Sequence, residues 1–208
     1  MPGGGTIVLL DTSAYVIYAL RASYRVGGRA RVFEHPLNSV ISRFLGFCKQ
    51  RGIRVVISKT VAEELDRVLT MAINRRMDEA GLRSYLVRQG IRQKCLRRAK
   101  RLGGFVEELE IGDPLVNRVR RMYLSSRDKL ARVKEAKGRR GLYPSETDMR
   151  ILAEAAKLAG LFNVYLVSAD MDFTCFKEEA LRRLNVKIVH VSELVSLMKK
   201  LRGDCREA

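Results

Sequence analysis

Acidic residues stand where hydrophobic runs of this sequence end. Asp11 follows the apolar run at 7–10, and Asp170 and Asp172 follow a second run at 163–168. The carboxyl ends of parallel strands meet at one edge of a sheet, so these side chains are expected to converge in a crevice. Carboxylates that crowd together repel one another unless a cation with oxygen ligands lies between them. The pattern therefore predicts a site for Mg²⁺ or Mn²⁺.

Two further carboxylates come from expected helices. In the helix that begins near residue 59, Glu64 lies at the edge of the buried stripe, whereas Glu63 points away from it. Asp148 stands in the first turn of a helix that follows Ser145. A carboxylate at the rim of a buried face is unfavourable unless it binds a cation or accepts hydrogen bonds. Glu64 and Asp148 are therefore candidates for the same site.

A structural role competes with this interpretation at two of the acids. Asp11 or Ser13 can cap the helix that follows the first strand. Ser145 and Asp148 have the spacing of a capping box. For Asp148 we favour the site, because this residue shares a helix face with Ile151, which must pack on the sheet.

Short strands and helices alternate along the chain. Runs rich in Val and Ile recur at 53–58, 163–168 and 186–191, and 37–50 has apolar residues at helical spacing. This alternation predicts an α/β fold with a central parallel sheet and helices on both faces. The segment 105–111 is ambiguous between strand and loop.

The chain is strongly basic. Its 208 residues include 40 Lys or Arg and 23 Asp or Glu, a net charge of +17. This excess favours a polyanionic partner, with nucleic acid ahead of an anionic membrane surface. No apolar run approaches the roughly 18 residues of a membrane span, and the N-terminus lacks the pattern of an export signal. We therefore expect a soluble cytoplasmic protein without membrane contact.

Much of the basic charge lies in the middle of the sequence. Residues 75–140 hold 20 basic and 8 acidic side chains, and 81–104 hold eight basic and no acidic ones. Apolar residues still recur there at helical spacing, which indicates an amphipathic helix. A second basic helix is expected from about 115 to 137. An acid-free surface repels itself without a partner. The expected contacts to RNA are Arg88, Arg92, Lys94, Arg97, Arg98 and Arg101.

The cysteines do not suggest a metal site. Cys48, Cys95, Cys175 and Cys205 are far apart in sequence, and the chain has only two histidines. The spacing of a zinc site is missing, so we interpret the cysteines as reduced and structural.

In order and spacing the acids resemble the PIN-domain nuclease family. The matching motifs are LLDTS with Asp11, VAEEL with Glu64, SETD with Asp148, and VSADMDF with Asp170 and Asp172. The resemblance covers about residues 6–75 and 143–201. It implies a Rossmann-like PIN fold in a single domain over 1–208, with a basic helical insertion at about 75–140.

The resemblance also implies metal-dependent cleavage of RNA. Asp11, Glu64, Asp148 and Asp170 would hold Mg²⁺ or Mn²⁺, and Asp172 would complete the catalytic set. In such sites the ions activate water and hold the phosphate, so no protein nucleophile is needed. The insertion makes the chain longer than the compact toxin-type members. It looks more like the small protein-only ribonuclease P group, which matures the 5′ ends of transfer RNA.

Other functions stay open at this point. A non-catalytic nucleic-acid-binding scaffold, a structure-specific DNA nuclease and a toxin-type ribonuclease are the alternatives. The sequence has no aromatic platform of the RNA-recognition type, so DNA stays open as a substrate. Whether the chain forms a homo-oligomer is also open.

Overall fold

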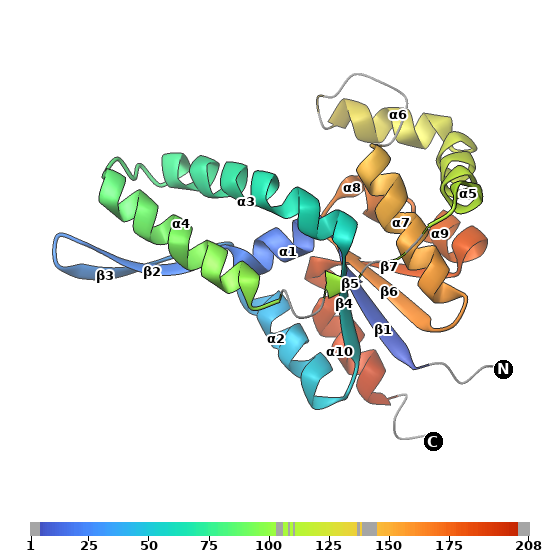
Figure 1. Cartoon of the computed structure of the whole chain (residues 1–208), viewed down its shortest axis with the longest axis horizontal. Coiled ribbons are helices and arrows are strands. Elements are labelled where there is room, and N and C mark those ends of the chain that lie inside the picture. Colours follow the sequence, from blue (N-terminus) through green and yellow to red (C-terminus); the bar gives the residue numbers. More distant parts are fainter. Residues whose placement is uncertain are drawn as a thin grey trace.

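A parallel β-sheet lies at the centre of the protein (Figure 1). The computed structural model describes residues 5–102, 106–107, 109, 111–136, 138 and 145–203. The strands of the sheet, in the spatial order β5-β4-β1-β6-β7, are β1 (Thr6–Leu10), β4 (Arg54–Ser58), β5 (Val106–Glu107), β6 (Asn163–Ser168) and β7 (Val186–His190). All neighbouring strands of this sheet are parallel. The four strands expected from the sequence are confirmed, and two residues of the ambiguous segment form the edge strand β5.

Helices connect the strands and flank the sheet. They are α1 (Thr12–Ala19), α2 (Asn38–Gln50), α3 (Lys59–Glu79), α4 (Tyr85–Lys100), α5 (Asp113–Leu124), α6 (Arg127–Ala136), α7 (Glu146–Ala159), α8 (Met171–Thr174), α9 (Lys177–Leu184) and α10 (Leu194–Gly203). A 3₁₀ turn at Val191–Glu193 precedes α10. Helix α7 packs along β6 and β7, and α2 packs against α10. The expected α/β fold with a parallel sheet is thus confirmed.

The strand order has a switch point at β1. From β1 the chain moves outward to β4 and β5, and it then returns across the sheet to β6. Leu9 of β1 lies opposite Val56 of β4 and Leu166 of β6, so the carboxyl ends of these three strands are aligned. Connections that diverge from a central strand leave a crevice at this end of a parallel sheet.

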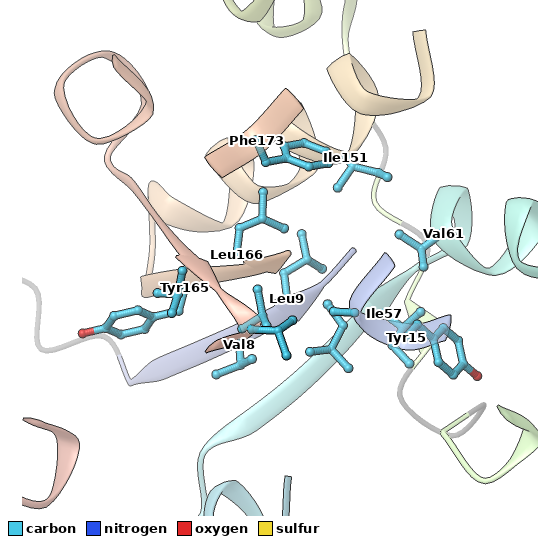
Figure 2. Close-up of a cluster of buried hydrophobic side chains, with 14 of the residues drawn as sticks. Val8, Leu9, Tyr15, Ile57, Val61, Ile151, Tyr165, Leu166 and Phe173 are labelled. Carbon is cyan, nitrogen blue, oxygen red and sulfur yellow. The ribbon is translucent and has the colours of Figure 1, made fainter. Parts of the chain in front are cut away.

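The strands are apolar because both faces of the sheet are covered. Val8, Leu9 and Leu10 are fully buried. Figure 2 shows Leu9 between Leu166 and Ile57, with side chains of the surrounding helices next to them. Parallel sheets covered on both faces require continuous hydrophobic runs. This requirement explains why the strands were recognisable in the sequence.

A β-hairpin that the sequence did not lead us to expect follows α1. Strands β2 (Arg21–Val26) and β3 (Arg29–Glu34) pair antiparallel across Gly27 and Gly28, whose φ angles are +57° and +75°. Two consecutive positive φ angles are typical of the tight hairpin turn that glycine permits. Helix α4 packs against β2, and the hairpin extends away from the sheet together with α3 and α4 (Figure 1). We call the hairpin, α4 and its C-terminal cap Arg101 (residues 21–34 and 85–101) the basic arm.

The expected single helix over 115–137 is wrong. Two helices, α5 and α6, occupy this region, and the chain turns between them at Ser125 and Ser126. The Ser125 hydroxyl donates to the carbonyl oxygen of Met122 at 2.8 Å, which closes the end of α5. Serine side chains that bond to nearby backbone compete with helix continuation.

Two further expectations concern cysteines and membranes. Cys48, Cys95 and Cys175 are free thiols, and Cys205 lies outside the described residues. Within the described part of the chain, no helix combines the length and the apolar character needed to cross a membrane.

Asn38 joins α2 to the end of α1 and offers a test of this packing. Its buried amide nitrogen donates to the carbonyl oxygens of Ile17 at 2.8 Å and Tyr18 at 2.7 Å. We expect Asn38→Ala to lower the free energy of unfolding by about 2 kcal/mol, because the carbonyl group of Ile17 loses this donor and that of Tyr18 loses one of its donors. Urea unfolding would measure this, with Asn74→Ala on the exposed face of α3 as the control. Equal small effects of both substitutions would contradict the assigned role.

Candidate functional site

Asp11 is buried at the junction of β1, α1 and β6. Only 2 % of the residue is exposed. One carboxylate oxygen accepts from the backbone N–H of Ala14 at 2.7 Å, and the other accepts from the Ser168 hydroxyl at 2.6 Å. The Ser13 hydroxyl lies 2.9 Å from both oxygens. Asp11 therefore caps α1, as one of the two interpretations expected, and it also links two strand ends.

The same hydroxyl groups connect Asp11 to the turn that carries Asp170. The Ser168 hydroxyl accepts from the backbone N–H of Asp170 at 2.8 Å, and the Ser13 hydroxyl accepts from Ala169 N–H at 2.8 Å. Asp170 in turn accepts from the backbone N–H of Asp172 at 2.8 Å. The structure thus brings Asp11 and the acids after β6 to one edge of the sheet.

Glu64 joins this edge from α3. Its carboxylate accepts from the Thr12 hydroxyl at 2.7 Å and from Arg67 at 3.2 Å. The Glu64 side chain is 23 % exposed, whereas Glu63 lies on the exposed face of the helix. The expected difference in burial between the two neighbouring glutamates is confirmed. Because Thr12 directly follows Asp11, the bond from Thr12 brings Glu64 to the same edge as Asp11.

Asp148 approaches the site from the first turn of α7. Ser145 caps this helix by accepting from the backbone N–H of Asp148 at 3.0 Å, which is half of the expected capping box. Burial raises the pKa of Tyr123 well above its ordinary value, and the charges of Asp148, Asp172 and Asp170 add to this rise. The charges of these three carboxylates therefore act on the same buried hydroxyl group.

Asp172 is fully buried and has a cationic neighbour. Oδ1 of Asp172 lies 3.5 Å from Nζ of Lys134 on α6, and both side chains are buried. The Tyr123 hydroxyl donates to the backbone carbonyl of Asp172 at 2.9 Å. Removing one partner of a buried ion pair typically costs about 3–5 kcal/mol. Asp172 is thus held by both helices α5 and α6.

The environment of Asp11 disfavours its charged form. Burial raises the pKa of Asp11 from 3.8 to about 7, and the charge of Asp170 raises it further, while the bonds from Ser168, Ala14 and Ser13 oppose the shift. A carboxylate held in this state gains stability from any nearby positive charge.

The donor set fits a hard divalent cation. The candidate ligands offer only carboxylate oxygens, which Mg²⁺ and Mn²⁺ prefer. Within the described residues, no three His, Cys, Asp or Glu side chains are close enough to share one ion. Hydroxyl groups hold Asp11, Thr12 and Arg67 hold Glu64, and Lys134 lies at Asp172. Cation binding would therefore draw the acids together.

The basic arm holds most of the expected RNA contacts. Lys94, Arg97, Arg98 and Arg101 surround a concavity of about 230 Å³ together with Arg21, Ala22 and Ser23 of β2. The prediction that the four side chains of this helical segment share one face is confirmed. Arg92 is exposed on the same helix.

Two of the expected contacts also serve the fold. Arg88 donates to Asp78 at 2.6 Å and to the carbonyl oxygen of Leu82 at 3.1 Å. Arg98 donates to the Tyr18 carbonyl oxygen at 2.7 Å, and its guanidinium lies 4.3 Å from the centre of the Tyr18 ring. These two arginines anchor α4. The exposed Lys94 also donates to the carbonyl oxygen of Ser23, and Arg92, Arg97 and Arg101 are the exposed arginines among the expected contacts.

Several residues of the site were not indicated by the local sequence pattern. The exposed residues Arg25, Arg29 and Arg31 lie on the hairpin. The Gly27-Gly28 pair between the two strands was the sequence signal that could have predicted this hairpin. Lys134 had no such signal, because its partner is distant in the sequence.

Glu154 is a further buried carboxylate and lies outside the cluster. It is 2 % exposed and accepts from the Thr60 hydroxyl at 2.6 Å. Burial raises its pKa. It lines a cavity of about 430 Å³ between α3, α5 and α7, together with Asp113 and Glu146. Helical spacing places it on a different face of α7 from Asp148.

Comparisons with known proteins do not add to this description. The chain matches no protein-family model, no curated protein and no solved structure. The fold and the side-chain geometry are therefore the basis of the functional argument.

The pKa of Asp11 leads to a prediction about stability without divalent cations. The folded state keeps the Asp11 carboxyl group protonated up to a pH of about 7, whereas the unfolded state loses this proton above pH 3.8. The stabilisation that this bound proton gives to the folded state is therefore lost as the pH rises through about 7. The unfolding free energy should fall by about 4 kcal/mol over this range from this group alone. Asp11→Asn should remove that part, as measured by urea unfolding in a chelator.

Asp66→Asn, on the exposed face of α3, is the control and should keep the pH dependence of the wild type. If Asp11→Asn and the wild type lost stability in parallel, the buried state of Asp11 would be refuted.

Proposed function

We propose that this chain is a metal-dependent endoribonuclease of the PIN type. The observation that carries the proposal is the network that joins Asp11 to Ser168 and Asp170, because it gathers carboxylates at the open end of the strand order. Glu64 and Asp148 approach the same edge from two helices. A strongly basic surface on the same chain favours a phosphodiester substrate over a small metabolite.

Asp11, Glu64, Asp148 and Asp170 would hold Mg²⁺ or Mn²⁺. Bound there, such ions would lower the pKa of water and stabilise charge on the scissile phosphate. The protein contributes the positions of the acids. Ser13 and Ser168 orient Asp11, Thr12 and Arg67 orient Glu64, and Tyr123 fixes the backbone that leads through Asp172.

The basic arm supports RNA with structure, such as a transfer RNA precursor, as the substrate. Its exposed arginines come from an antiparallel hairpin and a helix. Both of these elements extend away from the sheet (Figure 1). Contacts of this kind bind phosphates along a backbone and position the substrate without reading bases. The acids at the sheet edge and the arm would then share the work of cleavage and binding.

Carboxylate substitutions test the catalytic part of this proposal. Asp170→Asn and Asp148→Asn should lower kcat for RNA cleavage by about 100-fold or more, because they remove negative charge at nearly constant shape. Binding of RNA should change little. Labelled RNA and DNA, incubated with Mg²⁺, Mn²⁺ or a chelator, would give the rates and the substrate.

The neighbouring glutamates on α3 provide a matched control. Glu64→Gln should impair cleavage, whereas Glu63→Gln should be nearly silent, because the Glu63 side chain is exposed. Full activity in both aspartate variants would reject the site. Binding of RNA without cleavage under any metal condition would favour the non-catalytic scaffold, and cleavage of DNA alone would favour the structure-specific nuclease.

The basic arm gives a separate prediction about salt. Replacing Arg92, Arg97 and Arg101 with Gln should weaken RNA binding and flatten its dependence on salt. Each lost phosphate contact should change the slope of log affinity against log salt by about 0.7 to 0.9. Filter binding at several salt concentrations would measure this, with Arg75→Gln as a control, since Arg75 pairs with Glu79 on α3. An unchanged slope in the triple variant would assign the arm to another partner.

A further inference from the structure

A lysine of the helical insertion lies beside Asp172, one of the acids of the candidate site. Lys134 on α6 is 6 % exposed, and its Nζ is 3.5 Å from Oδ1 of Asp172, which has no exposed surface. Bulk water screens such a pair weakly, so each charge acts strongly on its surroundings. Lys134 therefore differs from the exposed basic side chains of the same segment.

The fold holds Lys134 in this position. Leu130 and Val133 on the same helix are buried, and α6 packs against α8, which contains Asp172. Lys129 on α6 pairs with Glu179 of α9 at 2.8 Å, and Tyr123 of α5 donates to the backbone of Asp172. The insertion is thus docked on the turn that follows β6 at several points.

We propose that Lys134 is a positioning residue that supplies a fixed positive charge at Asp172 and thereby limits divalent cation binding at this acid. The ammonium group balances the charge of Asp172. Divalent cations are then left to Asp11, Asp148, Asp170 and Glu64. This inference rests on the proposed function only in assigning a divalent cation to the acid cluster.

A merely structural ion pair predicts a different outcome. Loss of a structural pair lowers stability and leaves cation affinity unchanged. Loss of a counter-charge leaves an additional negative charge beside the cation site, which strengthens cation binding. The affinity of the protein for Mn²⁺ therefore separates the two roles.

The test is calorimetric titration of Mn²⁺ into the full chain without RNA. Lys134→Gln should bind Mn²⁺ about tenfold more tightly than the wild type, the scale expected for removing one unit charge a few ångströms from an ion. Lys134→Arg should bind like the wild type. The matched control is Lys129→Gln, which removes a lysine and an ion pair from the same helix. It should not alter Mn²⁺ affinity.

The double variant Asp172→Asn with Lys134→Gln completes the test. It removes both charges, so its Mn²⁺ affinity should return to that of the wild type. The double variant also tests the role of Lys134 if Lys134→Gln alone fails to fold. It leaves no buried charge without a partner, so we expect it to fold. Weaker binding by the double variant would identify Asp172 as a direct ligand and overturn the inference.

Two results separate this inference from the proposed function. If the wild type binds Mn²⁺ and Lys134→Gln binds it equally, the role of Lys134 is refuted and the nuclease proposal stands. If neither protein binds Mn²⁺, both are overturned. Absence of RNA cleavage by the wild type under every metal condition, with Mn²⁺ binding as expected, would refute the nuclease alone, because the titration contains no RNA.

Discussion

The burial of the Asp11 carboxylate is the constraint on which the rest of the site depends. This group caps α1 and accepts a hydroxyl from the end of β6, so it fixes the relation between the first helix and two neighbouring strands. Burial makes its charge unfavourable, and the charge of Asp170 adds to that effect. The protein partly offsets this with three hydrogen-bond donors. On the proposed function, a cation at this edge of the sheet would offset the remaining cost of the charge.

The helical insertion has two physical tasks. Its first part, α4, packs on the β2–β3 hairpin and presents exposed arginines away from the sheet. Its second part, α5 and α6, docks on α8 and α9 through an edge-to-face pair of Tyr123 and Phe176 and the ion pair of Lys129 with Glu179. On the proposed function, one continuous segment would link substrate binding to the arrangement of the acids.

The acids are held by protein groups of different kinds. Asp11 has neutral hydroxyl and amide donors, Glu64 has a hydroxyl and a partly exposed arginine, and Asp172 lies beside a buried ammonium group. These partners reduce repulsion between carboxylates without any ion. On the proposed function, these partners would compete with a cation for the same oxygens. Affinity for the cation would then depend on which partners the acids can release.

Local patterns in the sequence determined the parallel strands, the main helices and the edge at which Asp11, Asp170 and Asp172 meet. Continuous apolar runs report burial on both faces, and helical spacing separated Glu64 from Glu63, because both signals depend on residues close in the chain. The sequence also predicted that Ser145 caps the helix at Asp148, because these two residues are only three positions apart.

Only the tertiary structure decided where the distant partners lie. The position of Lys134 beside Asp172, and of Thr60 beside Glu154, depends on how separate helices pack, and no periodicity encodes such pairs. The chain turns between α5 and α6 where the Ser125 hydroxyl bonds to the backbone of α5. Many helices contain a serine without ending at it, so the residue type alone does not predict this break. Sequence therefore specified which elements form and which faces they bury. The three-dimensional packing of those faces determined which charged side chains lie next to each other, because an ion pair depends on distance in space and not on separation in the sequence.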